Sequence, residues 1–277
     1  MKTNPMRLAA LLTALSVATL AKGQASESGA IFFTTDTAKY TATNEYLFKD
    51  DGPRTPITRR SNGEPELGGN GVWNLPWISN FGNAQAKPGP APAKSWVNAM
   101  WAYHNASGSK YDPEGMCLPP GGPRSMATPY PAQIIQDRNR IVLIFEGGGH
   151  VWREIHMDGR QHPAEVNPTY FGHSVGHWER DTLVVDTVGY NEKTWLDYSG
   201  YQHTDQLHTV EYFSRPYREK LNYKVVIDDP GAFEKTWTAE WDIAWVEGQE
   251  LQDYVCQENN KYLQSLLDDL GQPFFRQ

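Results

Sequence analysis

Hydrophobic and polar residues alternate with a period of two over much of the chain from residue 132 onward, and short turns rich in Asp, Asn, Arg and Gly separate these stretches. Such alternation between turn residues is typical of half-buried strands. The segments expected as strands are 133–136, 140–146, 150–157, 178–179, 182–188, 207–214, 223–228 and 236–246. Long helices do not alternate with these strands, so we expect a mainly β fold. The prediction is an antiparallel β-barrel of about eight strands, lipocalin-like or related, with a sandwich as the alternative.

The residues before this region follow a different pattern. Of the 19 prolines, 13 lie between Pro53 and Pro131, and a strand ladder cannot use so many residues that lack an N–H. Four tryptophans in the same stretch still indicate packing. We therefore expect residues 24–131 to form an irregular arm, with a short helix at 93–103, packed on a barrel core of residues 132–257. Leucines spaced along one face predict a helix in the C-terminal segment 258–277.

The first 23 residues have the organisation of a signal peptide. Lys2 and Arg7 precede an apolar run at 8–20, and small residues follow at Ala21 and Gly23. The run is short for a membrane span, although an uncleaved anchor is the alternative. The expected location is outside the cell or in the lumen of the secretory pathway, with no membrane contact after cleavage.

Charge and cysteine usage narrow the classes of protein further. A formal net charge of −8 argues against nucleic-acid binding, which needs clustered Lys and Arg. In an oxidising compartment Cys117 and Cys256 are expected to form a disulfide, with two buried thiols as the alternative. The Asn105-Ala106-Ser107 sequence is a glycosylation acceptor in a eukaryotic host and predicts an exposed loop.

Charged residues recur on strands that are otherwise apolar. Glu146, Arg153, Asp186 and Glu211 are the examples. A buried charge without a partner costs several kcal/mol, so these groups must pair with one another or face a wet cavity. Internal ion pairs and a catalytic cavity are both consistent with this pattern.

Two rows of side chains are expected to share a strand face. The first row contains His150, Trp152, Glu154 and His156. The second row contains Trp237, Ala239, Trp241, Ile243 and Trp245. Three indoles around an alanine fit a dense core or the wall of a pocket for a flat organic ligand.

Histidine is the most concentrated chemistry-bearing residue. Seven of the eight histidines lie between His150 and His208, but no His-Glu-x-x-His arrangement occurs, and no metal site is predicted. Proton transfer or hydrogen bonding to a substrate is the preferred interpretation. The segment 172–176 matches the G-x-S-x-G nucleophile elbow, but a hairpin rather than a helix is expected to follow it, so its two glycines are interpreted as a bend.

Several separated motifs carry a resemblance to a known group of proteins. They are Gly172-His173-Ser174-Val175-Gly176-His177-Trp178, Asp181-Thr182-Leu183-Val184-Val185-Asp186-Thr187, Asp158-Gly159-Arg160-Gln161-His162-Pro163, Asp228-Asp229-Pro230-Gly231 and Cys256-Gln257-Glu258-Asn259-Asn260. Over roughly residues 113–260 the chain resembles a large group of secreted, mostly uncharacterised proteins that is common in bacteria. Arg180 departs from the pattern, because bacterial members tend to have glycine in that turn.

Fungal members of this group resemble the hetero-Diels–Alderases of tropolonic sesquiterpenoid pathways. The resemblance implies an enzyme without a cofactor that joins a tropolone o-quinone methide to a humulene-type alkene, so the expected partner is an apolar or aromatic small molecule. The proposed acid–base and hydrogen-bonding residues are Glu146, Arg153, His156, His173 and Glu211. The proposed substrate-binding residues are His150, Trp152, Trp237, Trp241 and Trp245.

The sequence is also consistent with three other functions. The first is a secreted hydrolase or lyase that uses carboxylates and histidine, the second is a lipocalin-like carrier, and the third is a structural protein with internal salt bridges. Asp186, Asn191 and Asn260 are interpreted mainly as residues that fix loops. A homodimer is also left open.

Overall fold

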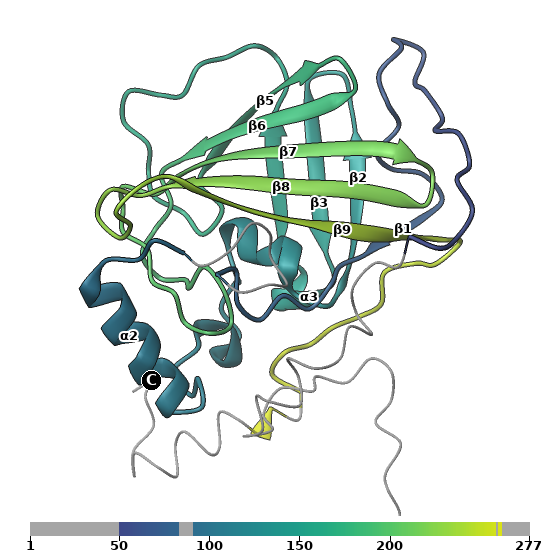
Figure 1. Ribbon diagram of the computed structural model, residues 1–277. Coiled ribbons are helices and arrows are strands. Elements are labelled where there is room, and N and C mark those ends of the chain that lie inside the picture. The colour runs from purple at the N-terminus through teal and green to yellow at the C-terminus, as the bar shows by residue number, and fades with distance from the viewer. Residues whose placement is uncertain (1–49, 83–90, 259, 262–277) are drawn as a thin grey trace, which may run out of the picture. The chain divides into compact units, whose positions relative to one another are not determined.

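The computed structural model describes residues 50–82, 91–258 and 260–261, and within them nine strands form one closed barrel (Figure 1). The strands are β1 (Gly71–Asn74), β2 (Pro131–Gln136), β3 (Arg140–Phe145), β4 (Trp152–His156), β5 (His173–Glu179), β6 (Thr182–Val188), β7 (His208–Tyr217), β8 (Lys220–Asp228) and β9 (Trp237–Glu247). Each strand pairs with the next in the chain, and β9 pairs with β1 to close the barrel. The mainly β, barrel-type fold expected from the sequence is confirmed.

One pairing differs from the expected antiparallel arrangement. β4 and β5 are parallel, with Ile155 opposite Ser174. A parallel pair needs a crossover connection instead of a tight turn, and the segment 157–172 provides it without a helix of its own. The prediction of purely antiparallel neighbours is therefore wrong at this point. β1 also lies inside the segment expected to be irregular.

Two details of the predicted strands change in the structure. The strand expected at 150–157 begins only at Trp152, because Gly147–His150 forms the short helical turn α3 and His150 has a φ of 56°. The G-x-S-x-G segment lies mostly within β5, so the bend is confined to Gly172, whose φ is 65°. Arg180, in the β5–β6 turn, has a φ of 56°, a left-handed conformation that glycine adopts without strain.

The barrel interior is filled by alternate residues of every strand and is closed at both ends by chain from outside it. At one end Leu67 is fully buried; its N–H donates to Gln136 Oε1 at 2.6 Å, and its carbonyl accepts from Trp73 Nε1 at 2.8 Å. At the other end Trp241 Nε1 donates to the carbonyl of Met126 at 3.0 Å, in the short helix η3 (Gly122–Ala127).

Helix α2 (Ser95–Ala106) covers most of the segment expected to be helical. Trp96, Met100 and Tyr103 share a face as the spacing predicts, but each of them is exposed. Asn105 is exposed in the last turn of α2 rather than in a loop, and its Nδ2 donates to the carbonyls of Trp101 and Ser199 at 2.8 and 2.7 Å. Its glycosylation stays a prediction.

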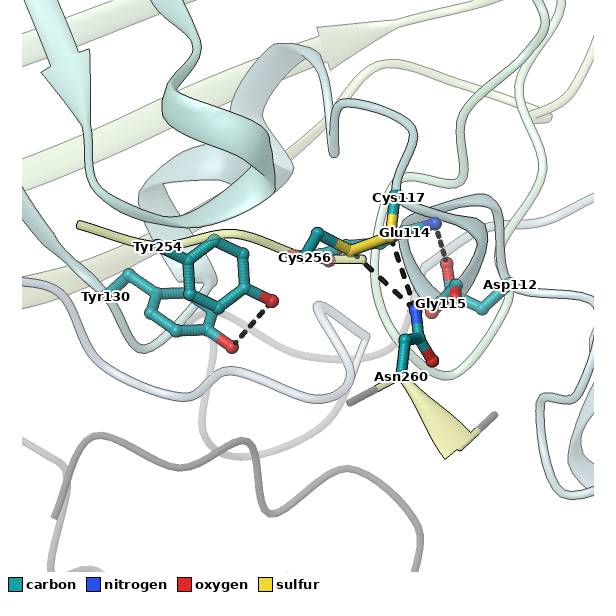
Figure 2. Close-up of a disulfide and its surroundings, with 8 residues drawn as sticks. All are labelled: Asp112, Glu114, Gly115, Cys117, Tyr130, Tyr254, Cys256 and Asn260. Atoms are coloured by element: carbon teal, nitrogen blue, oxygen red, sulfur yellow. Dashed lines mark hydrogen bonds between the residues drawn. A yellow bond between two sulfur atoms is a disulfide. The ribbon is translucent and has the colours of Figure 1, made fainter. Parts of the chain in front are cut away.

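The expected disulfide between Cys117 and Cys256 is confirmed (Figure 2). It joins the end of the short helix η2 (Pro113–Met116) to the chain that follows β9. Figure 2 shows Asn260 beside the bridge, with its Nδ2 3.3 Å from Cys117 Sγ. In the same view the rings of Tyr130 and Tyr254 lie against one another, 4.8 Å apart. These contacts hold the end of the described chain against the barrel.

The signal peptide predicted at residues 1–23 lies outside the described residues, and so does nearly all of the C-terminal helix predicted in 258–277. Within the part of the chain that the structure describes, no helix has the length and apolar character needed to cross a membrane.

We expect the disulfide to contribute strongly to stability, because it closes a loop with a sequence separation of 139. The chain-entropy treatment gives about 5 kcal/mol as an upper figure for a loop of this size. The double variant Cys117→Ala/Cys256→Ala should therefore unfold at a clearly lower urea concentration than the oxidised protein. Reduced wild-type protein is the control and should behave like the variant. Equal midpoints for the variant and the oxidised protein would contradict this expectation.

Candidate functional site

The structure places the residues singled out in the sequence in several separate parts of the fold. Arg153 and Glu211 pair inside the barrel, whereas His156 and His173 lie together on its outer face. Glu146 and His150 contact the chain that follows β9. Trp237 and Trp241 lie in the core, and Trp152 is exposed. Trp245 lines a cavity.

The barrel interior holds a completely buried ion pair. Arg153 on β4 donates from both terminal nitrogens to the Glu211 carboxylate on β7, and Tyr223 donates to Glu211 Oε1 at 2.7 Å. The other donors of Arg153 reach the hydroxyls of Ser174 and Thr187 at 3.1 and 2.9 Å. Both charges are thus neutralised and hydrogen-bonded without any ligand, which is the state that buried ion pairs require. We assign this network a structural role.

The two inner tryptophans of β9 are packed against other rings. Trp241 lies 4.8 Å from Tyr223 and 5.1 Å from Phe81, and Trp237 lies 5.2 Å from Phe233, measured between ring centroids. Trp237 and Trp241 are at most 8% exposed and belong to one continuous hydrophobic cluster. Their surroundings are those of core residues. Trp152, by contrast, is 61% exposed on the outside of the barrel.

Glu146 and His150 hold the chain that follows β9. Glu146 Oε2 accepts from the N–H of Gln252 at 2.7 Å, and His150 Nε2 accepts from the N–H of Tyr254 at 3.0 Å. Both side chains therefore bind backbone, which accounts for their polar character without a substrate.

The outer face of the barrel carries a linked group of histidines around one carboxylate, here named the His–Asp cluster: His156, His162, His173, Asp186 and His208. Asp186 accepts from His162 at 2.9 Å through one oxygen and from His208 at 3.0 Å through the other. His162 Nδ1 and His173 Nδ1 are 2.8 Å apart, and the ring of His156 lies 5.1 Å from that of His173. All of these side chains are partly exposed.

Strand alternation explains why this cluster lies outside the barrel. Ser174 and Thr187 point inward to Arg153, so their neighbours His173 and Asp186 must point outward. The crossover 157–172 then returns over this face and brings His162 to Asp186. Arg160 is fixed in the same segment by Asp158, with its Nε 2.9 Å from Oδ1.

Electrostatics favours an ionised carboxylate beside a neutral histidine. Burial raises the pKa of Asp186, but hydrogen bonds from His208 and His162 outweigh it, so the pKa lies below its ordinary value of 3.8. Burial lowers the pKa of His173, and neighbouring His162, His156 and Arg160 lower it further. At neutral pH the cluster therefore contains a carboxylate acceptor and an uncharged imidazole, which is the form that accepts a proton.

Sequence reasoning identified part of this cluster. The sequence predicts His156 and His173 as acid–base candidates and Asp186 mainly as a residue that fixes a loop, and it assigns no role to His162 or His208. The available signal was the crowding of histidines between residues 150 and 208. Among the described residues, no group of three His, Cys, Asp or Glu side chains has an arrangement that would hold a metal ion.

Comparison with known proteins gave no match: no family model, no curated protein and no solved structure matches the chain.

Removal of the charge on Glu211 should destabilise the protein, because Arg153 would be left buried and unneutralised. We expect Glu211→Gln to lower the free energy of unfolding by about 3–5 kcal/mol, measured by urea denaturation. Asp181→Asn is the matched control, since Asp181 pairs with Arg59 at the surface, where such pairs contribute about 1 kcal/mol or less. A loss for Glu211→Gln no larger than the control's would argue against the structural role.

His173 should titrate below 6.5, its ordinary pKa, when the ring nitrogens are followed by NMR. The unfolded chain then binds more protons in this range, so the contribution of His173 to stability is lost as pH falls from 6.5 through the folded pKa. Arg160→Gln should move the titration upward because it removes a neighbouring positive charge. The urea-unfolded protein supplies the reference. A folded midpoint at or above the reference contradicts the electrostatic account.

Proposed function

We propose that the protein is a cofactor-independent enzyme that transfers protons on a small organic substrate at the His–Asp cluster. The observation that carries the proposal is the hydrogen-bonded series Asp186–His162–His173 on the outer face of the barrel. A histidine oriented by a second group that is itself fixed by a carboxylate has the arrangement expected of a general base.

The tautomers of this series define a proton relay. When neutral His162 donates its Nε2 proton to Asp186, its Nδ1 accepts the Nδ1 proton of His173, and His173 Nε2 keeps its lone pair. If His173 Nε2 then takes a proton, the Nδ1 proton passes to His162. The positive charge comes to lie on His162, beside the Asp186 carboxylate that stabilises it. The atom that accepts the proton, His173 Nε2, is thus separated from the positive charge, which lies on His162.

The resemblance noted in the sequence supplies the candidate reaction, a hetero-Diels–Alder addition. First, a base removes the tropolone hydroxyl proton and an acid protonates the hydroxymethyl oxygen, so water leaves and an o-quinone methide forms. His173 is the proposed base and His156 the proposed acid. The quinone methide and the alkene then form one C–C and one C–O bond without gain or loss of atoms. No cofactor is needed for either step.

The surroundings of the cluster suit such a substrate. Asp186 is flanked in the sheet by Val175 on β5 and Val210 on β7, and all three residues are half-buried. Apolar flanks next to a proton relay hold a flat aromatic body close to the base. Holding two reactants in a productive orientation lowers the activation barrier of a cycloaddition by roughly several kcal/mol.

The test is incubation of the full protein with a hydroxymethyl tropolone and humulenol, followed by chromatography of the adducts. We expect faster adduct formation and one dominant stereoisomer, with the rate lowered about 10²-fold or more by Asp186→Asn. His177→Gln is the matched control, since His177 lies exposed on β5 and contacts Glu179 outside the cluster.

Adduct yield and stereochemistry equal to those of a protein-free reaction would overturn the cycloaddition. Turnover of an ester or glycoside that depends on Asp186 would instead assign the relay to a hydrolase. Loss of activity in His177→Gln equal to that in Asp186→Asn would remove the cluster from the mechanism.

A further inference from the structure

A cavity of about 440 Å³ opens where the segment before β1 passes the ends of β2 and β9 and the β7–β8 turn. In Figure 1 this segment is the purple and blue trace beside the barrel. Its lining includes three arginines, two glutamates and an apolar wall, which are Arg60, Arg215, Arg218, Glu66, Glu247, Ile134, Ile135 and Trp245. The volume lies in the usual range of small-molecule sites.

Arg215 is the residue that distinguishes this cavity. It is 5% exposed, and its guanidinium lies over two indoles that also contact each other, 4.7 Å from the Trp73 ring and 4.8 Å from the Trp245 ring. Its nitrogens donate to the backbone carbonyls of Glu66, Gly68 and Arg218. Among the described residues, no carboxylate accepts a hydrogen bond from it.

The other two buried arginines among the described residues each have a carboxylate partner, which Arg215 lacks. Arg153 is paired through two hydrogen bonds with Glu211, and Arg124 is paired in the same way with Asp112, at 2.9 and 2.6 Å. A buried guanidinium normally has such a planar, two-point anionic partner. Arg215 has carbonyls and ring faces instead, which solvate the charge only in part.

The charge on Arg215 persists at neutral pH. Burial and the neighbouring charge of Arg218 together lower the pKa of Arg215 to about 10, against the opposing effect of Glu66, Glu219 and Glu247. A value of about 10 still leaves the guanidinium protonated at pH 7. The cavity therefore has a buried positive charge at its wall.

The nearby carboxylates are already engaged. Glu247 Oε2 accepts from both Arg218 and Trp245 Nε1 at 2.7 Å, and Glu66 Oε1 accepts from the N–H of Gly68 at 3.2 Å. Arg60 donates to the carbonyl of Gln136. The lining thus has one more cation than it has anions, in a chain whose formal net charge is −8.

We propose that this cavity binds a small organic anion, namely a carboxylate on a flat aromatic body. Four of the five N–H groups of Arg215 already donate to the carbonyls of Glu66, Gly68 and Arg218, so the carboxylate would accept one hydrogen bond from the remaining N–H and neutralise the charge at that point. The aromatic body would lie against Trp245, with Ile135 at the exposed edge of the cavity. This binding site is independent of the proposed function: Arg215 is seven residues from His208 along β7, roughly 23 Å at the rise of a strand, and points to the opposite face.

The experiment is a calorimetric titration of the full protein with 2-naphthoate. The neutral 2-naphthamide has the same body without the charge, and acetate has the charge without the body. We expect saturable binding of 2-naphthoate, about tenfold or more tighter than that of either comparison compound, because both the charge and the stacking surface contribute.

Replacement of Arg215 by Met would remove packing contacts as well as the charge. Two other variants therefore test the site. Ile135→Glu places a negative charge at the exposed edge of the cavity, and Arg218→Ala removes a cation from its lining. Both should weaken 2-naphthoate binding about tenfold or more. Arg140→Ala removes an exposed arginine that does not line the cavity and should leave binding unchanged.

Thermal unfolding confirms that each variant is folded before its affinity is compared. The proposal is overturned if 2-naphthamide binds as tightly as 2-naphthoate, if 2-naphthoate shows no saturable binding to the folded protein, or if Ile135→Glu and Arg218→Ala bind it as the wild type does. The rate of adduct formation by Ile135→Glu in the tropolone assay is measured as well. That assay reports on the His–Asp cluster alone, so its result does not bear on the cavity.

Discussion

The salt bridge between Arg153 and Glu211 determines which side chains of β4, β5, β6 and β7 point into the barrel and which point outward. Arg153 needs acceptors inside the barrel, and Ser174 and Thr187 supply them from β5 and β6. Once those hydroxyls point inward, the preceding residue on each strand points outward, so His173 and Asp186 meet on the outer face. The position of the His–Asp cluster is therefore a consequence of the interior ion pair, because a shift of either strand by one residue would turn both sets of side chains to the opposite faces.

Much of the barrel could be predicted because strands and tight turns leave local signals. Segments such as 182–188 agree with the observed strand bounds, since the alternation reports directly on burial. The parallel pairing of β4 with β5 left no such signal, because it depends on a crossover of residues distant in sequence. β1 was missed for a related reason: its four residues form a strand only because β2 and β9 already offer open edges on both sides.

The candidate site was predictable only in part, and the difference lies in how its members come together. His156 and His173 could be named because histidine on an apolar strand is conspicuous. The role of His162 depends on the path of an irregular crossover, and that of His208 on the register of β6 with β7, which places Asp186 opposite Val210. Trp237 and Trp241 belong to the hydrophobic core cluster. The sequence leaves core and pocket wall as alternatives for them, because a row of indoles on one strand face looks the same in both cases, and their role in substrate binding stays a prediction.

Complete hydrogen bonding separates structural polar groups from groups that act on something else. Arg153 and Glu211 satisfy each other and leave no capacity for a ligand, which agrees with their position in the sealed interior. His173 has one ring nitrogen engaged by His162, so its other nitrogen is available at a partly exposed surface. Arg215 is buried like Arg153 yet lacks a carboxylate among the described residues. Arg215 donates four hydrogen bonds to backbone carbonyls, so what distinguishes it from Arg153 is the missing negative charge, and this difference is the basis of the proposed anion site.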